Sequence, residues 1–125
     1  MDENEISHAI IGAAIEAHRV LGPGLLESVY EAALSHELKE RGFMVQQQLE
    51  LPVIYKGLEL LGGYRIDLLV NRLVIVEIKS VEKMMPIHEA QVLTYLKLSG
   101  KKLGLLLNFN STAVGTSVRR VVNNL

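Results

Sequence analysis

Three charged residues interrupt a stretch of sequence that otherwise consists of apolar, strand-forming residues. Asp67 lies within the apolar segment 64–70, Glu77 lies within the segment 73–78, and Lys79 follows directly. A buried carboxylate needs a partner, a bound metal or a raised pKa, because removing its charge from water is costly. Glu77 and Lys79 are two residues apart, so on a strand both side chains leave the same face of the sheet. These three residues are therefore the first candidates for chemistry.

The side chains themselves indicate which chemistry that would be. Asp67 and Glu77 offer hard oxygen ligands, which suit Mg²⁺ or Mn²⁺ and do not suit zinc. A neighbouring ammonium, such as that of Lys79, could lower the pKa of a metal-bound water or stabilise charge that develops on a phosphate. The same residues also allow a structural interpretation, in which they form an ion network with Arg65 at the edge of a sheet. Spacing alone does not separate the two interpretations.

The turn between the two apolar segments decides whether the carboxylates can meet. If residues 71–72 formed a strict two-residue loop, Asp67 would pair with Val76. Glu77 would then point to the other side of the sheet. A loop of three residues, or a bulge, would instead place Asp67 opposite Glu77 on one face. A metal site therefore requires the longer turn.

Hydrophobic periodicity predicts the elements that must position these residues. Apolar residues recur at three and four positions over residues 5–20 and 26–38, which predicts two amphipathic helices. A third helix is expected to begin at Pro86 and to end at Gly100. Helices before and within a run of strands predict an α/β or α+β fold, with helices packed against a sheet. The expected strands cover residues 43–51, 53–55, 58–61, 64–70, 73–78, 103–109 and 116–122, with a hairpin turn at residues 56–57.

Composition limits the class of protein. The chain has 125 residues, 49% of them hydrophobic and 22% charged, so we expect a single domain over residues 1–125. Cysteine is absent, which excludes thiolate metal sites, iron–sulfur clusters, a cysteine nucleophile and disulfide scaffolds. A net charge of −1 excludes nucleic-acid binding through bulk charge, although a local basic groove remains compatible with it. We expect no membrane association and a cytoplasmic location, because no apolar run approaches the roughly 20 residues that span a bilayer.

The spacing of the charged residues resembles a known signature. Asp67, nine intervening residues and then Glu77-Ile78-Lys79 resemble the D…(D/E)xK pattern of the PD-(D/E)XK nuclease superfamily. That resemblance implies an α/β fold with a restriction-endonuclease-like core, in which helices flank a mixed β-sheet. It also implies a metal-dependent nuclease that hydrolyses phosphodiester bonds.

A second motif resembles one branch of this superfamily. Residues 21–31 are similar to the hallmark of the GxxExxY family, which Gly24, Glu27 and Tyr30 carry here. Tyr30 itself is expected in the core, because it lies on the apolar stripe of its helix. The similarity runs from about residue 6 to residue 122. Other segments that resemble the family's pattern, in the expected order, are residues 53–57, Gln91 with Tyr95, and residues 105–109.

The resemblance implies a role for each matching residue. The metal ligands that it implies are the carboxylates of Asp67, Glu77 and Glu27 and the main-chain carbonyl of Ile78, with Mg²⁺ or Mn²⁺ as the cofactor. Glu31 lies one helical turn after Glu27 and is a weaker candidate. Lys79 would position or activate the attacking water.

Further residues are expected to contact the substrate. Gln91 and Tyr95 have the QxxxY spacing of RecB-like members of the superfamily, and this spacing puts both on one helix face. The resemblance implies that Gln91 bonds the metal-bound water or the scissile phosphate and that Tyr95 contacts the nucleic-acid backbone. Lys56, Arg65 and Lys83 are basic groups available for phosphate contacts.

The expected partner is nucleic acid, with DNA as the first candidate, and a homodimer is compatible with the sequence. Two other functions stay open. The chain could be a non-catalytic nucleic-acid-binding module, although a complete acidic set would weaken a site that only binds phosphates. It could also be a protein-interaction or assembly subunit, since its high apolar content leaves surface that a homodimer could bury.

Overall fold

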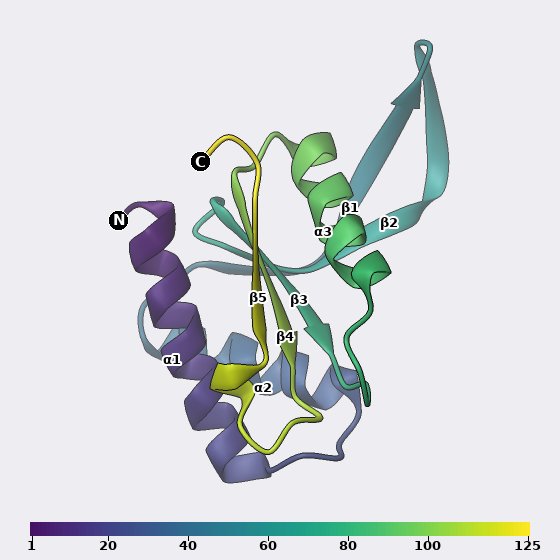
Figure 1. The fold of residues 1–125 in the computed structure, drawn as a ribbon. Helices are drawn as coiled ribbons and strands as arrows, with labels where there is room; N and C mark the ends of the chain where they lie inside the picture. Colours follow the sequence, from purple (N-terminus) through teal and green to yellow (C-terminus); the bar gives the residue numbers. More distant parts are fainter.

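The computed structural model describes the backbone of residues 1–125 and every side chain except those of residues 61, 62 and 116. Its strands form one mixed sheet in the order β1-β2-β3-β4-β5, with β3 and β4 parallel and the other neighbours antiparallel (Figure 1). In chain order the elements are α1 (Glu3–Leu21), α2 (Glu27–Glu40), β1 (Val45–Tyr55), β2 (Leu58–Val70), β3 (Val74–Lys79), α3 (Pro86–Ser99), β4 (Leu103–Asn108), the 3₁₀ turn η1 (Val114–Thr116) and β5 (Val118–Val122).

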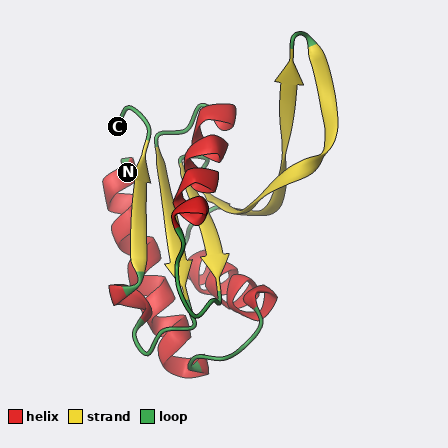
Figure 2. Ribbon diagram, turned by 45° about the vertical axis from the view of Figure 1, so that its right-hand side comes forward, coloured by secondary structure: helices red, strands yellow, loops and turns green.

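Helices cover both faces of this sheet (Figure 2). Apolar residues of α1 and α2 pack on one face in the main core, and Tyr95 and Leu96 of α3 pack on the other face in a smaller core. Strands β3 and β4 are almost entirely buried, as expected for parallel neighbours with helices on both sides. The expected α/β fold, a mixed sheet flanked by helices, is confirmed. Among the described residues, none of the helices is long and apolar enough to cross a membrane.

Two pairs of strands expected from the sequence are each a single strand in the structure. The expected strands 43–51 and 53–55 are one continuous strand, β1, although Pro52 interrupts them. A proline is tolerated there because β1 is an edge strand, and because the register with β2 shifts between Leu51 and Val53. The expected strands 58–61 and 64–70 are likewise one strand, β2. The result is a long hairpin whose outer part projects beyond the rest of the sheet (Figure 1).

Tyr30 fixes the bend between the first two helices. Its ring is buried and stacks on Phe109, with 4.5 Å between the ring centroids. Its hydroxyl donates a hydrogen bond to the Gly22 carbonyl and accepts one from the Leu25 N–H, at 2.5 and 3.1 Å. The prediction that Tyr30 belongs to the core is confirmed. Because this contact holds the loop at residues 22–26, it also fixes where α2 begins and which way its first carboxylates point.

The contact between α3 and β4 leaves no room for a side chain at Gly104. A Cβ atom on Gly104 would lie 2.6 Å from Cγ1 of Val92, a stiff β-branched side chain. We therefore expect Gly104→Ala to lower the free energy of unfolding by about 1–3 kcal/mol, which denaturant titration would measure.

Two variants control this experiment. Gly63→Ala should leave stability nearly unchanged, because a Cβ atom there meets nothing within 4 Å. Adding Val92→Ala to Gly104→Ala should cost less than the two single changes together. If the two changes were simply additive, the close approach of Gly104 to Val92 would not be the cause.

Candidate metal centre

The turn between β2 and β3 has the longer of the two lengths considered from the sequence. Val70 pairs with Val74, so residues 71–73 form a three-residue connection. Asn71 and Arg72 both have positive φ angles, of 50° and 58°, and the Leu73 N–H donates to the Val70 carbonyl at 3.0 Å. This register, continued past the pair Leu68–Val76, brings Asp67 opposite Glu77. The condition that a metal site requires is therefore met.

Backbone N–H groups hold the two carboxylates in place. The Asp67 N–H donates to Oε1 of Glu77 at 3.1 Å, and the Ile78 N–H donates to Oδ2 of Asp67 at 2.8 Å. The regular pairing of β2 with β3 runs from Val70 to Leu68, so these bonds lie just beyond it. Where the two strands separate, these backbone N–H groups thus donate to carboxylate oxygens, and not to main-chain carbonyls of the facing strand.

Burial and like charge act together on Glu77. Only 4% of its surface is exposed. Loss of hydration, followed by the nearby charge of Asp67, raises the pKa of the Glu77 carboxyl to about 8, although the Lys79 ammonium opposes the rise. Lys79 is half-buried on the same strand. Two carboxylates that cannot both ionise easily form a place where a proton or a cation is favoured.

The α2 carboxylate linked to this pair is that of Glu31. Nε2 of Gln48 donates to Oε1 of Glu31 at 2.6 Å and to Oδ1 of Asp67 at 3.2 Å. Gln47 donates to the other Glu31 oxygen at 3.3 Å. Burial, followed by the charge of Asp67, raises the pKa of Glu31. A chain of polar contacts therefore runs from α2 through Gln48 to Asp67.

The carboxylate of Glu27, at the start of α2, lies next to the residue that follows β3. Its Oε2 accepts a hydrogen bond from the Ser80 N–H at 2.9 Å, and the Ser80 hydroxyl donates to the Leu25 carbonyl at 3.1 Å. Glu27 therefore joins the start of α2 to the residue after Lys79. Among the side chains that the structure describes, no three acidic or histidine residues are close enough together to hold a metal ion as they stand.

Near Gln48 and Asp67, the buried side chains of β2 switch from one face of the sheet to the other. Leu68 packs with α1 and α2, whereas Ile66, two residues away on β2, packs in the smaller core with α3. Gln48 has a φ angle of 50°, a left-handed conformation that is unusual for a residue other than glycine within a strand. Sequence reasoning missed Gln48, since nothing in its type or spacing indicates a left-handed backbone. The only signal was the run of three glutamines in an otherwise partly apolar strand.

Tyr95 of α3, with Gln91 hydrogen-bonded to it, approaches the carboxylates from the face of the sheet opposite α1 and α2. Tyr95 is 4% exposed and meets the ring of Tyr64 edge to face, with 5.9 Å between centroids. Burial, then the charges of Glu77 and Asp67, raises the pKa of the Tyr95 hydroxyl to about 12, and a hydrogen bond with Gln91 opposes the rise. Little of Tyr95 is therefore open to a nucleic-acid backbone.

The basic residues considered from the sequence are scattered. Lys56 lies at the tip of the hairpin, 5.3 Å above the ring of Tyr55. Arg65 is exposed and faces Glu50 across the strand pair, at 3.9 Å. Lys83 is exposed in the segment between β3 and α3. The structure thus leaves Lys79 as the ammonium next to the carboxylates, while the other three lie on outer surfaces.

The raised pKa of Glu77 predicts how the stability of the metal-free protein depends on pH. The folded chain binds the Glu77 proton more tightly than the unfolded chain does, because the pKa of the Glu77 carboxyl in the unfolded chain is near 4.5. The stabilisation is therefore complete below pH 4.5 and is lost as the pH rises through about 8. In EDTA, the free energy of unfolding of the wild type should fall relative to that of Glu77→Gln across this window, by a few kcal/mol at most.

Glu82→Gln is the matched control, because it removes an exposed carboxyl in the segment between β3 and α3. Its pH dependence should follow that of the wild type. Parallel curves for the wild type and Glu77→Gln would contradict the assignment of the proton to Glu77.

Residues 4–121 match the family model described as the PD-(D/E)XK nuclease superfamily. No curated protein and no solved structure matches the chain. Members of this superfamily are typically nucleases and generally use divalent metals such as Mg²⁺. The match spans the opposed carboxylates, Lys79 and the helices that flank them, so the chain belongs to the PD-(D/E)XK nuclease superfamily.

Proposed function

We propose that this chain is a metal-dependent nuclease of the GxxExxY branch, folded as a single domain, that hydrolyses phosphodiester bonds in nucleic acid. The observation that carries the proposal is the placement of Asp67 opposite Glu77, with Lys79 on the same strand as Glu77. Superfamily membership supports a nuclease-type activity in general. The local geometry supports assigning that activity to these residues.

The donor set fits a divalent cation. Asp67 and Glu77 supply hard oxygens at one point, and their mutual repulsion is what a cation would relieve. Glu27 and the Ile78 carbonyl are the further donors that we assign to the site. Bound there, Mg²⁺ or Mn²⁺ would polarise the phosphate and make a bound water more acidic.

The chain's own residues would orient the reactants and balance charge. The Lys79 ammonium is suited to stabilise negative charge on the phosphate and to orient the attacking water. The Tyr95 hydroxyl is protonated at neutral pH, as tyrosine ordinarily is, so it can act as a hydrogen-bond donor. Gln91, bonded to Tyr95, is suited to orient either that hydroxyl or a phosphate oxygen.

The substrate and setting follow from charge and composition. We propose DNA as the first substrate, bound weakly and in a salt-sensitive way because the net charge is −1. Arg65 and Lys83 are exposed basic groups close in sequence to the acidic pair. A cytoplasmic location and a homodimer are further parts of the proposal, the first being compatible with the absence of cysteine.

Cleavage of labelled DNA and RNA in Mg²⁺, Mn²⁺ or EDTA tests this function. Asp67→Asn and Lys79→Ala should each lower the rate of metal-dependent cleavage by about 100-fold or more, because each removes a group that acts on the reacting phosphate. Glu82→Gln, an exposed carboxyl shortly after Lys79, should cleave like the wild type. Thermal unfolding of each variant would show that the fold persists.

The other outcomes are equally informative. Cleavage that survives both changes would place the activity at another site or in a contaminant. A folded protein that retards nucleic acid in a gel but never cuts it would instead support a non-catalytic binding module. Neither cutting nor binding would favour an assembly subunit.

We further propose that Gln48 positions Asp67 and Glu31 for the cation. Gln48→Leu should weaken Mg²⁺ or Mn²⁺ binding by about 10–100-fold in calorimetry, because both carboxylates lose a donor that orients them. Gln46→Leu is the control, since the Gln46 side chain makes no hydrogen bond among the described side chains. The affinity of this variant for Mg²⁺ or Mn²⁺ should stay near the wild-type value. Equal affinities for the two variants would contradict the role of Gln48.

A further inference from the structure

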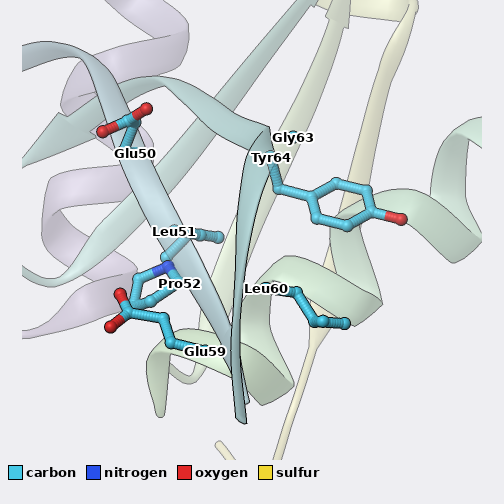
Figure 3. A pocket seen from close by; sticks show the side chains of 7 residues that line it. All are labelled: Glu50, Leu51, Pro52, Glu59, Leu60, Gly63 and Tyr64. Carbon is cyan, nitrogen blue, oxygen red and sulfur yellow. The ribbon is translucent and has the colours of Figure 1, made fainter. Parts of the chain in front are cut away.

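The outer part of the β1–β2 hairpin has one face that is apolar in every described residue. Residues directly opposite one another in an antiparallel pair point to the same face. The pairs on this face are Leu51–Tyr64, Val53–Leu60 and Tyr55–Leu58. We call Val53, Tyr55, Leu58, Leu60 and Tyr64 the apolar hairpin face. Figure 3 shows Leu60 and Tyr64 on one side of the hairpin, and Pro52 and Glu59 on the other.

Helix α3 covers the base of this face and leaves its outer part open. Near the base, Leu49, Leu51 and Ile66 pack in the smaller core with α3. Further out, Leu58 is 61% exposed and Leu60 is 45% exposed. Large apolar side chains gathered on one exposed face of a soluble protein generally mark a contact surface.

The backbone of β2 is also open along the outer hairpin. Strand β3 pairs with β2 at Leu68, Leu69 and Val70, so among the described residues of the outer hairpin, 58–60 and 63–66, the edge of β2 on that side is not part of a ladder. Unpaired N–H and C=O groups along an edge strand form a template for another strand. The surface therefore offers main-chain as well as apolar contacts.

The charges of the hairpin favour a second copy over nucleic acid. Glu50 and Glu59 balance Lys56 and Arg65, so the hairpin has no basic excess to attract phosphates. Glu59 and Arg65 lie three positions on either side of residue 62. If two β2 strands pair antiparallel about that residue, Glu59 of each copy faces Arg65 of the other. Arg65 is available for this contact, because its exposed pair with Glu50 at 3.9 Å is weak.

The same pairing matches the apolar residues. Leu60 and Tyr64 lie two positions on either side of residue 62, so Leu60 of one copy would face Tyr64 of the other. Tyr64 lines a hollow against α3 together with Ile87, Ala90 and Thr94. The outer part of each hairpin would thus extend over the α3 helix of the other copy.

We infer that the apolar hairpin face binds a second copy of this chain, through antiparallel pairing of the two β2 strands about a two-fold axis. The contact is self-complementary in charge and in apolar surface, as a two-fold interface requires. It rests on the hairpin alone and does not depend on nuclease activity.

The mass of the full chain in solution, measured by sedimentation over a range of concentrations, tests this inference. The wild type should form a dimer. Leu58→Lys should weaken self-association at least about tenfold, because it puts a charge into the apolar contact. Ile54→Lys is a closely matched control. Ile54 is 61% exposed, the same as Leu58, and it pairs with Glu59 on the opposite face.

A charge exchange tests the register of the pairing. Glu59→Arg and Arg65→Glu should each weaken the dimer, and the double variant should restore it, because each acid again faces a base. A wild type that is monomeric at all concentrations would overturn the inference. So would a dimer that Leu58→Lys leaves intact. The wild type could also be a monomer that binds a labelled duplex, with Leu58→Lys abolishing that binding. This result would identify nucleic acid as the occupant and would also overturn the inference.

Discussion

Two carboxylates of like charge lie opposite each other where β2 and β3 separate, and backbone N–H groups of the facing strands hold them there. Their repulsion in a buried setting is the constraint on which the site depends. It is visible in the Glu77 carboxyl, whose pKa rises to about 8. A fold that only needed stability would gain by replacing such a pair with apolar residues.

The helices are arranged around this pair from both faces of the sheet. Helix α2 presents Glu31 and Glu27 near the ends of the strands, and Tyr30 fixes the start of that helix. Helix α3 brings Tyr95 and Gln91 from the opposite face. The site is thus built on the ends and edges of rigid elements, and the main core beneath it consists of α1, α2 and the sheet.

Much of this arrangement could be predicted from the sequence, because periodicity and charge report directly on it. Asp67, Glu77 and Lys79 stood out as charges in apolar strands. Other features depend on backbone conformations that side chains do not announce. The residues at 71–72 were compatible with either turn length, and Gln48 adopts a positive φ angle in the middle of a strand.

Local signals also misled where tertiary context decided the outcome. Pro52 suggested a break between two strands, yet an edge strand needs no donor at that position. Glu27 and Glu31 make different contacts that the sequence could not separate. The Glu27 carboxylate accepts from the Ser80 N–H, whereas Glu31 is linked to Asp67 through Gln48. Both carboxylates lie on one helix, one turn apart, so periodicity alone could not distinguish their contacts.

The three-residue turn at 71–73 places an unusual requirement on natural variants of this protein. Inserting or deleting one residue there would move Asp67 to the other face of the sheet, because side chains alternate along a strand. Asn71 further anchors the turn, since it exchanges two hydrogen bonds with Met44, at 2.8 and 2.9 Å. Surface turns usually tolerate insertions and deletions better than the strands and helices that they connect. In this lineage the turn should instead vary in composition and keep its length, so an alignment gap there would mark a protein that has lost the acidic pair's geometry.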